Sequence, residues 1–415
     1  MTKTSRGPAL LILFATLMAT AATGISIVAF PWLALKYDDS AEDASIVAAA
    51  MTLPLVIATL VAGTAVDIFG RRRISLVSDS LSGVAVATVP LIGWLLGVND
   101  INIPVLAVLA FFAAAFDPAG LTSRQSMLPE AAARAGWSLD RINAIFEAIL
   151  NLGFMVGPGI GGLMIAAVGG INTMWITAGL FGSSFLAIAA LRLEGAGKPH
   201  HAARPEGLVS GVTEGLRFVW NLRVLRTLGL IDLAVTALYL PMESVLFPKY
   251  FADRNQPAQL GWALMALATG GVVGALSYAA LAKYVRRRRA LLTATLTFGA
   301  ATVGIAFLPP LPVILALSAV TGLVYGPIQP IYAYTIQTRA PHHLRGRAVG
   351  VMAGLTYAAG PLGLLVAGPL ADNAGLKVTF FALAVPIIAI GLIAIRLPSL
   401  HELDRAPDFV DDPGP

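Results

Sequence analysis

The sequence predicts an all-α integral membrane protein with twelve transmembrane helices in two six-helix bundles. Of its 415 residues, 57% are hydrophobic and only 12% are charged, whereas soluble proteins carry roughly 25% charged residues. Twelve apolar runs are each long enough to cross a bilayer, which takes about 20 residues. A polar stretch separates six of these runs from the other six. This composition argues against the soluble enzyme classes.

The first six predicted spans belong to an N-terminal bundle over residues 1–195. Lys3 and Arg6 precede the first span, which exceeds the roughly 7–15 apolar residues of a signal peptide, so we expect it to remain in the protein. Basic or polar connections separate the following spans. The six spans cover residues 8–35, 44–66, 75–97, 103–123, 142–168 and 172–193.

The second half repeats this organisation after a polar linker, predicted over residues 196–223. A C-terminal bundle is predicted over 224–400, and an acidic, proline-containing tail over 401–415, which we expect to be disordered. Internal repeats of this kind build transporters with a site between the repeats. The six spans of this half cover residues 224–248, 258–283, 290–309, 311–336, 346–371 and 376–396.

The basic residues are distributed unequally between the two sides of the predicted membrane. Of 28 Lys and Arg residues, 24 lie on the side of both termini. The positive-inside rule therefore places both termini in the cytoplasm. The four on the opposite side are Lys36, Lys249, Arg254 and Lys377.

The loop between spans two and three has the pattern G-x-x-x-D-x-x-G-R-R-R. A carboxylate in such a loop can accept hydrogen bonds from a helix N-terminus or an arginine, and a glycine permits a tight turn. We interpret the loop as a conformational latch, and the alternative is a basic anchor with an incidental acid. The pattern consists of Gly63, Asp67, Gly70, Arg71, Arg72 and Arg73.

Span five carries the pattern G-x-x-x-G-P-x-x-G-G. Glycines four residues apart let a second helix approach closely, and the proline removes a backbone donor and bends the helix. These properties suit a joint between moving helices, although glycine and proline are also common in static membrane packing. The pattern consists of Gly153, Gly157, Pro158, Gly161 and Gly162.

Both patterns resemble motifs of the major facilitator superfamily, and the second resembles the span-five motif of its drug:proton antiporters. Residues 63–73, 127–143 and 323–332 are similar to the Tap-type multidrug efflux pumps of mycobacteria. The resemblance covers nearly the whole chain. It implies the major facilitator fold and proton-driven export, by alternating access, of antibiotics such as tetracycline and aminoglycosides.

Acidic residues inside the predicted spans are candidates for proton coupling. A carboxyl group at low dielectric favours its neutral form, so it can bind and release a proton between two access states. The alternative for each is a structural hydrogen bond. The candidates are Glu147, Glu243, Asp117 and Asp232.

Two arginine pairings are also expected. The resemblance implies that Asp117 completes a charge relay with Arg71, and we interpret Asp79 as an interfacial partner of the Arg71 cluster. No Lys or Arg is predicted well inside any span, which argues against an anionic substrate.

Aromatic and amide side chains are candidates for a substrate cavity, with ordinary helix packing as the alternative for each. The Gly326-Pro327 pair is expected to break span ten and to free backbone carbonyl groups. The candidates are Asn151, Trp262, Tyr325, Gln329 and Tyr332.

Taken together, these features predict a drug exporter of the bacterial inner membrane. The chain has neither a cysteine nor a G-x-x-x-x-G-K-[ST] loop, which excludes a cysteine-ligated metal and this type of ATP site. We expect no metal, no cofactor and no catalytic residue, and the proton gradient as energy source. The expected partners are small-molecule drugs, protons and membrane lipids, without nucleic acid, and the chain is expected to be a monomer. The alternatives are a lysolipid flippase and a siderophore or metabolite exporter.

The charge distribution predicts the orientation of the chain. Because the chain lacks cysteine, single variants can be labelled without a background reaction. An impermeant thiol reagent added to intact spheroplasts is expected to label Ser40→Cys and Asn255→Cys but not Ala203→Cys. The reverse labelling pattern would show that the orientation is inverted.

Overall fold

A computed structural model describes residues 5–38, 40–95, 102–193, 208–281, 284–340 and 342–404, some of them by their backbone only. These residues form helices and no strands, and they contain twelve helical segments long and apolar enough to cross a membrane. The predicted fold class is therefore confirmed. The chain divides into two compact units, one formed by Met1–Arg204 with Pro248–Gly261 and the other by Pro205–Phe247 with Trp262–Pro415.

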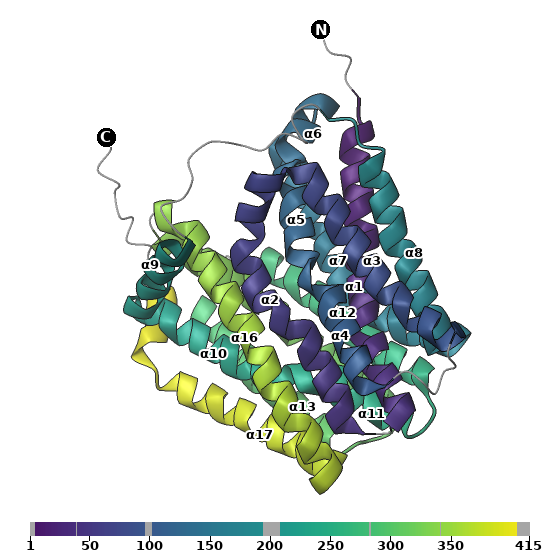
Figure 1. Ribbon diagram of the computed structural model, residues 1–415. Coiled ribbons are helices and arrows are strands. Elements are labelled where there is room, and N and C mark those ends of the chain that lie inside the picture. Colours follow the sequence, from purple (N-terminus) through teal and green to yellow (C-terminus); the bar gives the residue numbers. More distant parts are fainter. Residues whose placement is uncertain are drawn as a thin grey trace. The chain divides into compact units, whose positions relative to one another are not determined.

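The first unit contains eight helices before its short C-terminal segment, among the residues described. In Figure 1, α3 and α8 lie side by side, and α1 packs against both α7 and α8. The helices are α1 (Gly7–Asp38), α2 (Ala41–Phe69), α3 (Arg71–Leu95), α4 (Ile103–Ala115), α5 (Asp117–Ser126), α6 (Leu128–Ala135), α7 (Leu139–Val168) and α8 (Gly170–Ala189).

The predicted span 103–123 is longer and more segmented than expected, because α4, α5 and α6 follow one another without a connecting loop. Pro118 and Pro129 each lie in the first turn of their helix. A proline has no N–H group to donate to the preceding turn, so each one starts a new helix. The whole segment Ile103–Ala135 is one candidate membrane span.

The glycines of α7 bring its backbone against α1. A Cβ atom at Gly157 would lie 2.8 Å from the Cα of Gly24, and one at Gly161 would lie 3.2 Å from the Cα of Ile25. One at Gly153 would overlap the side chain of Thr20. The two backbones therefore meet directly along this seam, as expected for small residues spaced four apart. Helix α7 continues through Pro158.

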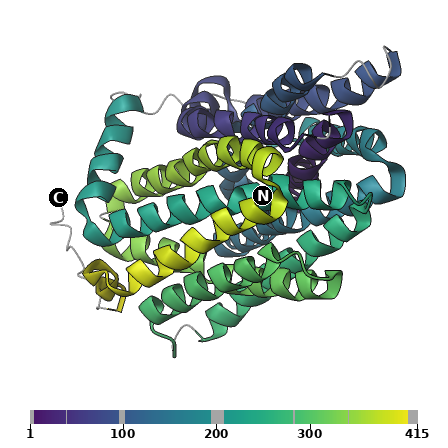
Figure 2. The same cartoon turned by 90° about the horizontal axis from the view of Figure 1, so that it is seen from below.

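The second unit contains the remaining long helices, and Figure 2 shows α10 between α16 and α17. Its buried core includes Leu228 of α10 and Phe298 of α13. The elements after residue 207 are α9 (Leu208–Asn221), α10 (Arg223–Pro241), a π-helical turn (Met242–Leu246), α11 (Phe247–Ala252), α12 (Pro257–Leu281), α13 (Arg287–Ala306), α14 (Leu311–Tyr325), α15 (Ile328–Arg339), α16 (His342–Ala374), α17 (Leu376–Ile395) and a 3-10 turn (Pro398–Asp404).

The second half contains the predicted break in span ten, the predicted linker and the start of the predicted tail. Span ten is broken as predicted, because α14 ends at Tyr325 and α15 begins at Ile328. The second part of the predicted linker forms helix α9. The start of the predicted tail forms the 3-10 turn, and residues 405–415 lie outside the described part of the chain.

The seam between α1 and α7 predicts a strong dependence on residue size. Gly157→Leu is expected to lower the stability of the protein by about 1–3 kcal/mol or more, because overpacking forces the two backbones apart. Thermal melting of the purified protein measures the loss. Gly179→Leu is the matched control, since a Cβ atom at Gly179 of α8 has nothing within 4 Å. Equal melting temperatures for the two variants would contradict the seam.

Candidate functional site

A buried ion pair connects α5 to α3 in the first unit. Arg124 of α5 donates to Asp79 of α3, and the two residues are only 3% and 2% exposed. The second oxygen of Asp79 accepts a hydrogen bond of 2.7 Å from Ser184 of α8. The Nε of Arg124 is buried and makes no hydrogen bond to a described atom. Two charges this completely buried are tolerated only as a pair.

A second carboxylate, Asp117, lies beside this pair at the start of α5. It accepts hydrogen bonds from Thr23 of α1 at 2.7 Å and from Ser82 of α3 at 3.3 Å. Asp117 interacts electrostatically with both Asp79 and Arg124, and Arg124 follows it by about two helical turns on the same face. The cluster thus contains two acids and one base, and Asp117 has only hydroxyl donors as direct partners among the described side chains.

Two expected pairings are wrong. Arg71 forms its ion pair with Glu130, not with Asp117. Asp79 pairs with Arg124, not with the Arg71 cluster. The physical reason is that α5 extends to Ser126 and packs against α3, which carries Arg124 into the protein interior. The expectation that no arginine lies inside a span is wrong for the same reason.

The remaining latch residues have structural roles at helix ends. Gly70 has a φ of 90° and ends α2, so the expected tight turn is present. Arg72 donates to the carbonyl groups of Ile188 and Ala189, the last of α8, and Arg73 is exposed. Gly63 and Asp67 belong to α2, but their side-chain positions lie outside the described part of the structure.

The other span-five candidates lie on α7. Gly162 packs against Gly261 at the start of α12, where a Cβ atom would lie 2.7 Å from the Cα of Gly261. Glu147 and Asn151 are exposed, one turn apart, and the Asn151 amide donates to the Glu147 carbonyl oxygen at 2.8 Å. Glu147 is therefore the most accessible of the four coupling candidates.

In the second unit, Asp232 of α10 is 4% exposed and accepts a hydrogen bond from Thr356 of α16. Tyr332 of α15 is 5% exposed and interacts electrostatically with Asp232. No ion pair involves Asp232 among the side chains that the structure describes. A hydroxyl group and a phenol therefore provide its polar surroundings.

Glu243 lies in the π-helical turn that follows Pro241, half-buried, and is hydrogen-bonded to Tyr239 one turn earlier. Tyr239 stacks on Tyr325 with ring centroids 6.3 Å apart and meets Phe298 at 5.0 Å. A proline removes the donor that would continue a regular helix, and π-turns often occur at functional sites. The acid thus lies next to an aromatic cluster.

Asp117 and Asp232 each contact a threonine hydroxyl group that also contacts a backbone carbonyl oxygen. The hydroxyl group of Thr23 lies 2.7 Å from Asp117 and 3.1 Å from the carbonyl oxygen of Ala19. That of Thr356 likewise contacts Asp232 and lies 3.1 Å from the Met352 carbonyl oxygen. A hydroxyl group has one proton. It can donate to an ionised carboxylate, or it can donate to the carbonyl oxygen while accepting from a protonated carboxyl group, so both protonation states are accommodated without moving the chain.

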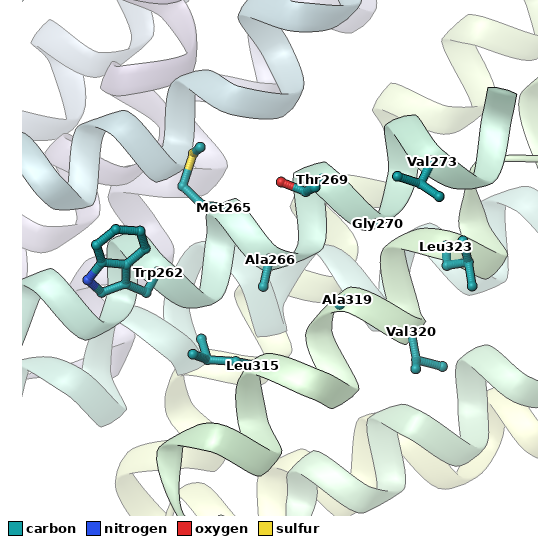
Figure 3. A pocket seen from close by; sticks show the side chains of 10 residues that line it. All are labelled: Trp262, Met265, Ala266, Thr269, Gly270, Val273, Leu315, Ala319, Val320 and Leu323. Carbon is teal, nitrogen blue, oxygen red and sulfur yellow. The ribbon is translucent and has the colours of Figure 1, made fainter.

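Trp262 lies in a different place, in an apolar groove of about 560 Å³ between α12 and α14 (Figure 3). Large side chains such as Met265 and Leu315 line it, and Thr269 supplies a single hydroxyl group. Its floor is formed by close backbone contact, since a Cβ atom at Gly270 would overlap the carbonyl group of Ala319.

The predicted cavity residues do not form one site. Tyr325 and Tyr332 belong to the aromatic and acidic cluster, whereas Trp262 is at the far end of α12. Gly326 contacts Gly274, which follows Trp262 by twelve residues, or about 18 Å of helix. The side chain of Gln329 lies outside the described part of the structure.

Several residues of these clusters were missed by sequence reasoning. Arg124 lies one residue beyond the predicted span 103–123, although its spacing of seven residues from Asp117 would place both on one helix face. The hydroxyl partners carry no sequence signal, because serine and threonine are frequent in membrane helices. They are Thr23, Ser82, Ser184 and Thr356.

Comparison with known proteins identifies the family. The family model of the transmembrane secretion effectors, MFS_3, matches residues 9–412. The chain belongs to this family of the major facilitator superfamily. It is 72% identical over 407 residues to the multidrug efflux pump Tap of Mycobacterium tuberculosis H37Rv, covering 98% of this chain and 97% of that protein. It is 62% identical to the multidrug efflux pump Tap of Mycolicibacterium fortuitum, covering 98% and 99%.

Solved structures show the same fold at low sequence similarity. The nucleoside transporter NupG superposes with a TM-score of 0.73 at 10% identity, covering 93% of this chain and 98% of that one. This chain is therefore a multi-pass membrane transporter of the major facilitator type and not an enzyme.

The buried ion pair predicts a characteristic pattern of stability. Arg124→Gln leaves Asp79 buried and unpaired and is expected to cost about 3–5 kcal/mol. The double variant Asp79→Asn, Arg124→Gln removes both charges and is expected to recover part of this loss. Arg71→Gln is the control, because its pair with Glu130 is partly exposed and such pairs contribute about 0–1 kcal/mol. Melting curves that rank Arg71→Gln as the most destabilised would contradict this assignment.

Proposed function

We propose that this transporter exports amphiphilic antibiotics, such as tetracycline and aminoglycosides, across the bacterial inner membrane in exchange for protons. Its relatives in two mycobacterial genera are named multidrug efflux pumps at 72% and 62% identity over nearly the full chain. The distribution of Lys and Arg supports a cytoplasmic location for both termini. The partners are drug molecules, protons and membrane lipids, without nucleic acid or a cofactor, and the chain acts as a monomer.

The observation that carries the proton coupling is a set of acids inside the candidate membrane spans that form no ion pair with a described side chain. Asp117, Asp232 and Glu243 are hydrogen-bonded to hydroxyl groups. A carboxyl group in such a place is least costly to bury when it carries a proton. Access to water from one side and then the other lets it release that proton, and this exchange can be linked to drug movement in the opposite direction.

The threonine arrangement supports proton exchange at Asp117 and Asp232. Loss of a proton normally leaves a buried acid without the hydrogen bonds that its new charge requires. Here Thr23 and Thr356 can turn from a carbonyl oxygen to the carboxylate. We expect this rearrangement to reduce the barrier to deprotonation at both sites.

Alternating access is supported by the seam between α1 and α7. Because backbone meets backbone at Gly24 and Gly157, the two helices have few side chains to rearrange when they move against each other. In the same mechanism the loop around Gly70 acts as a conformational latch, and Asp67 is the residue proposed to close the cytoplasmic side.

The charges inside the spans also bear on the substrate. The buried charged side chains among the described residues are Asp79, Arg124 and Asp232, and Arg124 is already paired. An anionic siderophore requires unpaired basic groups, so this inventory favours neutral or cationic amphiphiles. The aromatic cluster around Tyr325 and the apolar groove at Trp262 provide two surfaces for the apolar part of such a molecule.

Neutralising the acids tests the coupling. Asp117→Asn, Asp232→Asn, Glu243→Gln and Glu147→Gln keep the side-chain shape but cannot carry an exchangeable acidic proton. In proteoliposomes loaded with tetracycline, at least one of the first three is expected to lose uphill transport under an imposed pH gradient while keeping downhill flux. Glu147→Gln is expected to have the smallest effect, because its side chain is already exposed.

Two controls make this experiment specific. Asp253→Asn changes an acid paired with Lys249 outside the coupling clusters and should respond to the gradient like the wild type. Thr23→Val removes the hydroxyl group that Thr23→Ser keeps, so only the valine variant should alter the pH dependence of transport. If every acid variant, including one that combines the four substitutions, transports tetracycline in response to the pH gradient as the wild type does, the proton assignment is wrong.

A further inference from the structure

Helix α9 is held at the edge of the membrane by its connection to α10. It ends at Asn221, and Arg223 is the first residue of the next candidate span. Only Leu222 separates them. Figure 2 shows α9 running across the ends of α10 and α16, and it packs on both. Its C-terminal end therefore lies where hydrocarbon gives way to water.

The surface of α9 is divided into three strips. Val219 is 1% exposed and belongs to the core of the second unit, with Phe218 packed against the same core. Leu216 and Trp220, four residues apart and hence on one flank, are 43% and 48% exposed. The third strip is polar and exposed and includes Asn221. One apolar flank thus remains uncovered beside a polar one.

Basic groups surround the exposed tryptophan. Arg217 and Arg223 are exposed, and Arg226 donates to the carbonyl oxygen of Trp220 at 3.3 Å. From residue 208 to 226 the chain has three arginines and one acid, Glu214. Tryptophan favours the level of the lipid headgroups, and guanidinium groups match the geometry of phosphate. A helix with this distribution typically lies in the interfacial plane.

We propose that α9 is a binding surface for anionic phospholipid. Leu216 and Trp220 lie among the upper acyl-chain segments, while Arg217 and Arg223 bind the headgroup phosphate. Arg226 fixes the end of α9 next to Trp220. The position of α9 at the membrane edge favours lipid over a protein partner, because bilayer is present there whatever else the transporter binds.

Site-directed spin labelling tests the position of the apolar flank. The chain has no cysteine, so Leu216→Cys and Asn221→Cys can each carry one nitroxide in the full-length protein, reconstituted in phosphatidylcholine vesicles containing phosphatidylglycerol. The label at 216 is expected to collide mainly with oxygen, which concentrates in the bilayer. The matched label at 221 is expected to collide mainly with a water-soluble nickel complex.

Native mass spectrometry tests the headgroup. Retention of phosphatidylglycerol is expected to fall by about fivefold for each arginine removed in Arg217→Gln and Arg223→Gln, as for other basic residues near an anionic surface. Arg192→Gln, an exposed arginine of the other unit, should leave retention unchanged. Retention of phosphatidylcholine should not change in any variant.

Three results would overturn the proposal. Exposure of the label at 216 to the nickel complex would place the flank in water. Shielding of that label from both reagents, dependent on protein concentration, would show that a second copy or another protein covers it. Equal loss of phosphatidylglycerol in Arg192→Gln and Arg217→Gln would show general attraction to a basic protein instead of a site on α9.

Discussion

The hydrocarbon interior offers no water, so each polar group inside a span must find its partner within the chain. This constraint explains the most enclosed part of the first unit. Arg124 and Asp79 can be buried because each neutralises the other and Ser184 completes the coordination of the carboxylate. Replacing this pair by apolar residues can leave such a core equally stable. The pair places a positive and a negative charge next to Asp117.

The cluster contains three ionisable groups, the carboxyl groups of Asp79 and Asp117 and the guanidinium group of Arg124. Two carboxyl groups share the field of one guanidinium group, and the Nε of Arg124 has no partner among the described atoms. A change of charge on Asp117 would alter the balance between the two acids without requiring a new residue to enter. In the second unit the acids Asp232 and Glu243 are surrounded by hydroxyl and phenol groups. Hydroxyl groups thus solvate buried acids in both units, and the first unit adds an ion pair.

The sequence was sufficient for features that depend on composition along the chain. Twelve spans, the break before Ile328 and the turn at Gly70 follow from apolar length and from the backbone limits of proline and glycine. The pairings were not predictable, because they depend on which helix faces meet. Arg124 lies just beyond the predicted span 103–123, because the end of an apolar run does not show where a helix ends. Trp262 and Tyr325 were grouped by chemical type, yet about 18 Å of α12 separates them.

The seam between α1 and α7 also limits how the transporter can change over generations. A Cβ atom at Gly24 or Gly157 would lie 2.8 Å from the Cα atom of the other glycine, too close to the opposite backbone. Backbone atoms cannot be mutated away, so a clash there has no compensating partner mutation. A compound that recognised this seam would face a target with few viable escape variants, whereas one bound to the exposed side chains of the Trp262 groove would face many. Where a pump is attacked can therefore determine how soon resistance to the inhibitor appears.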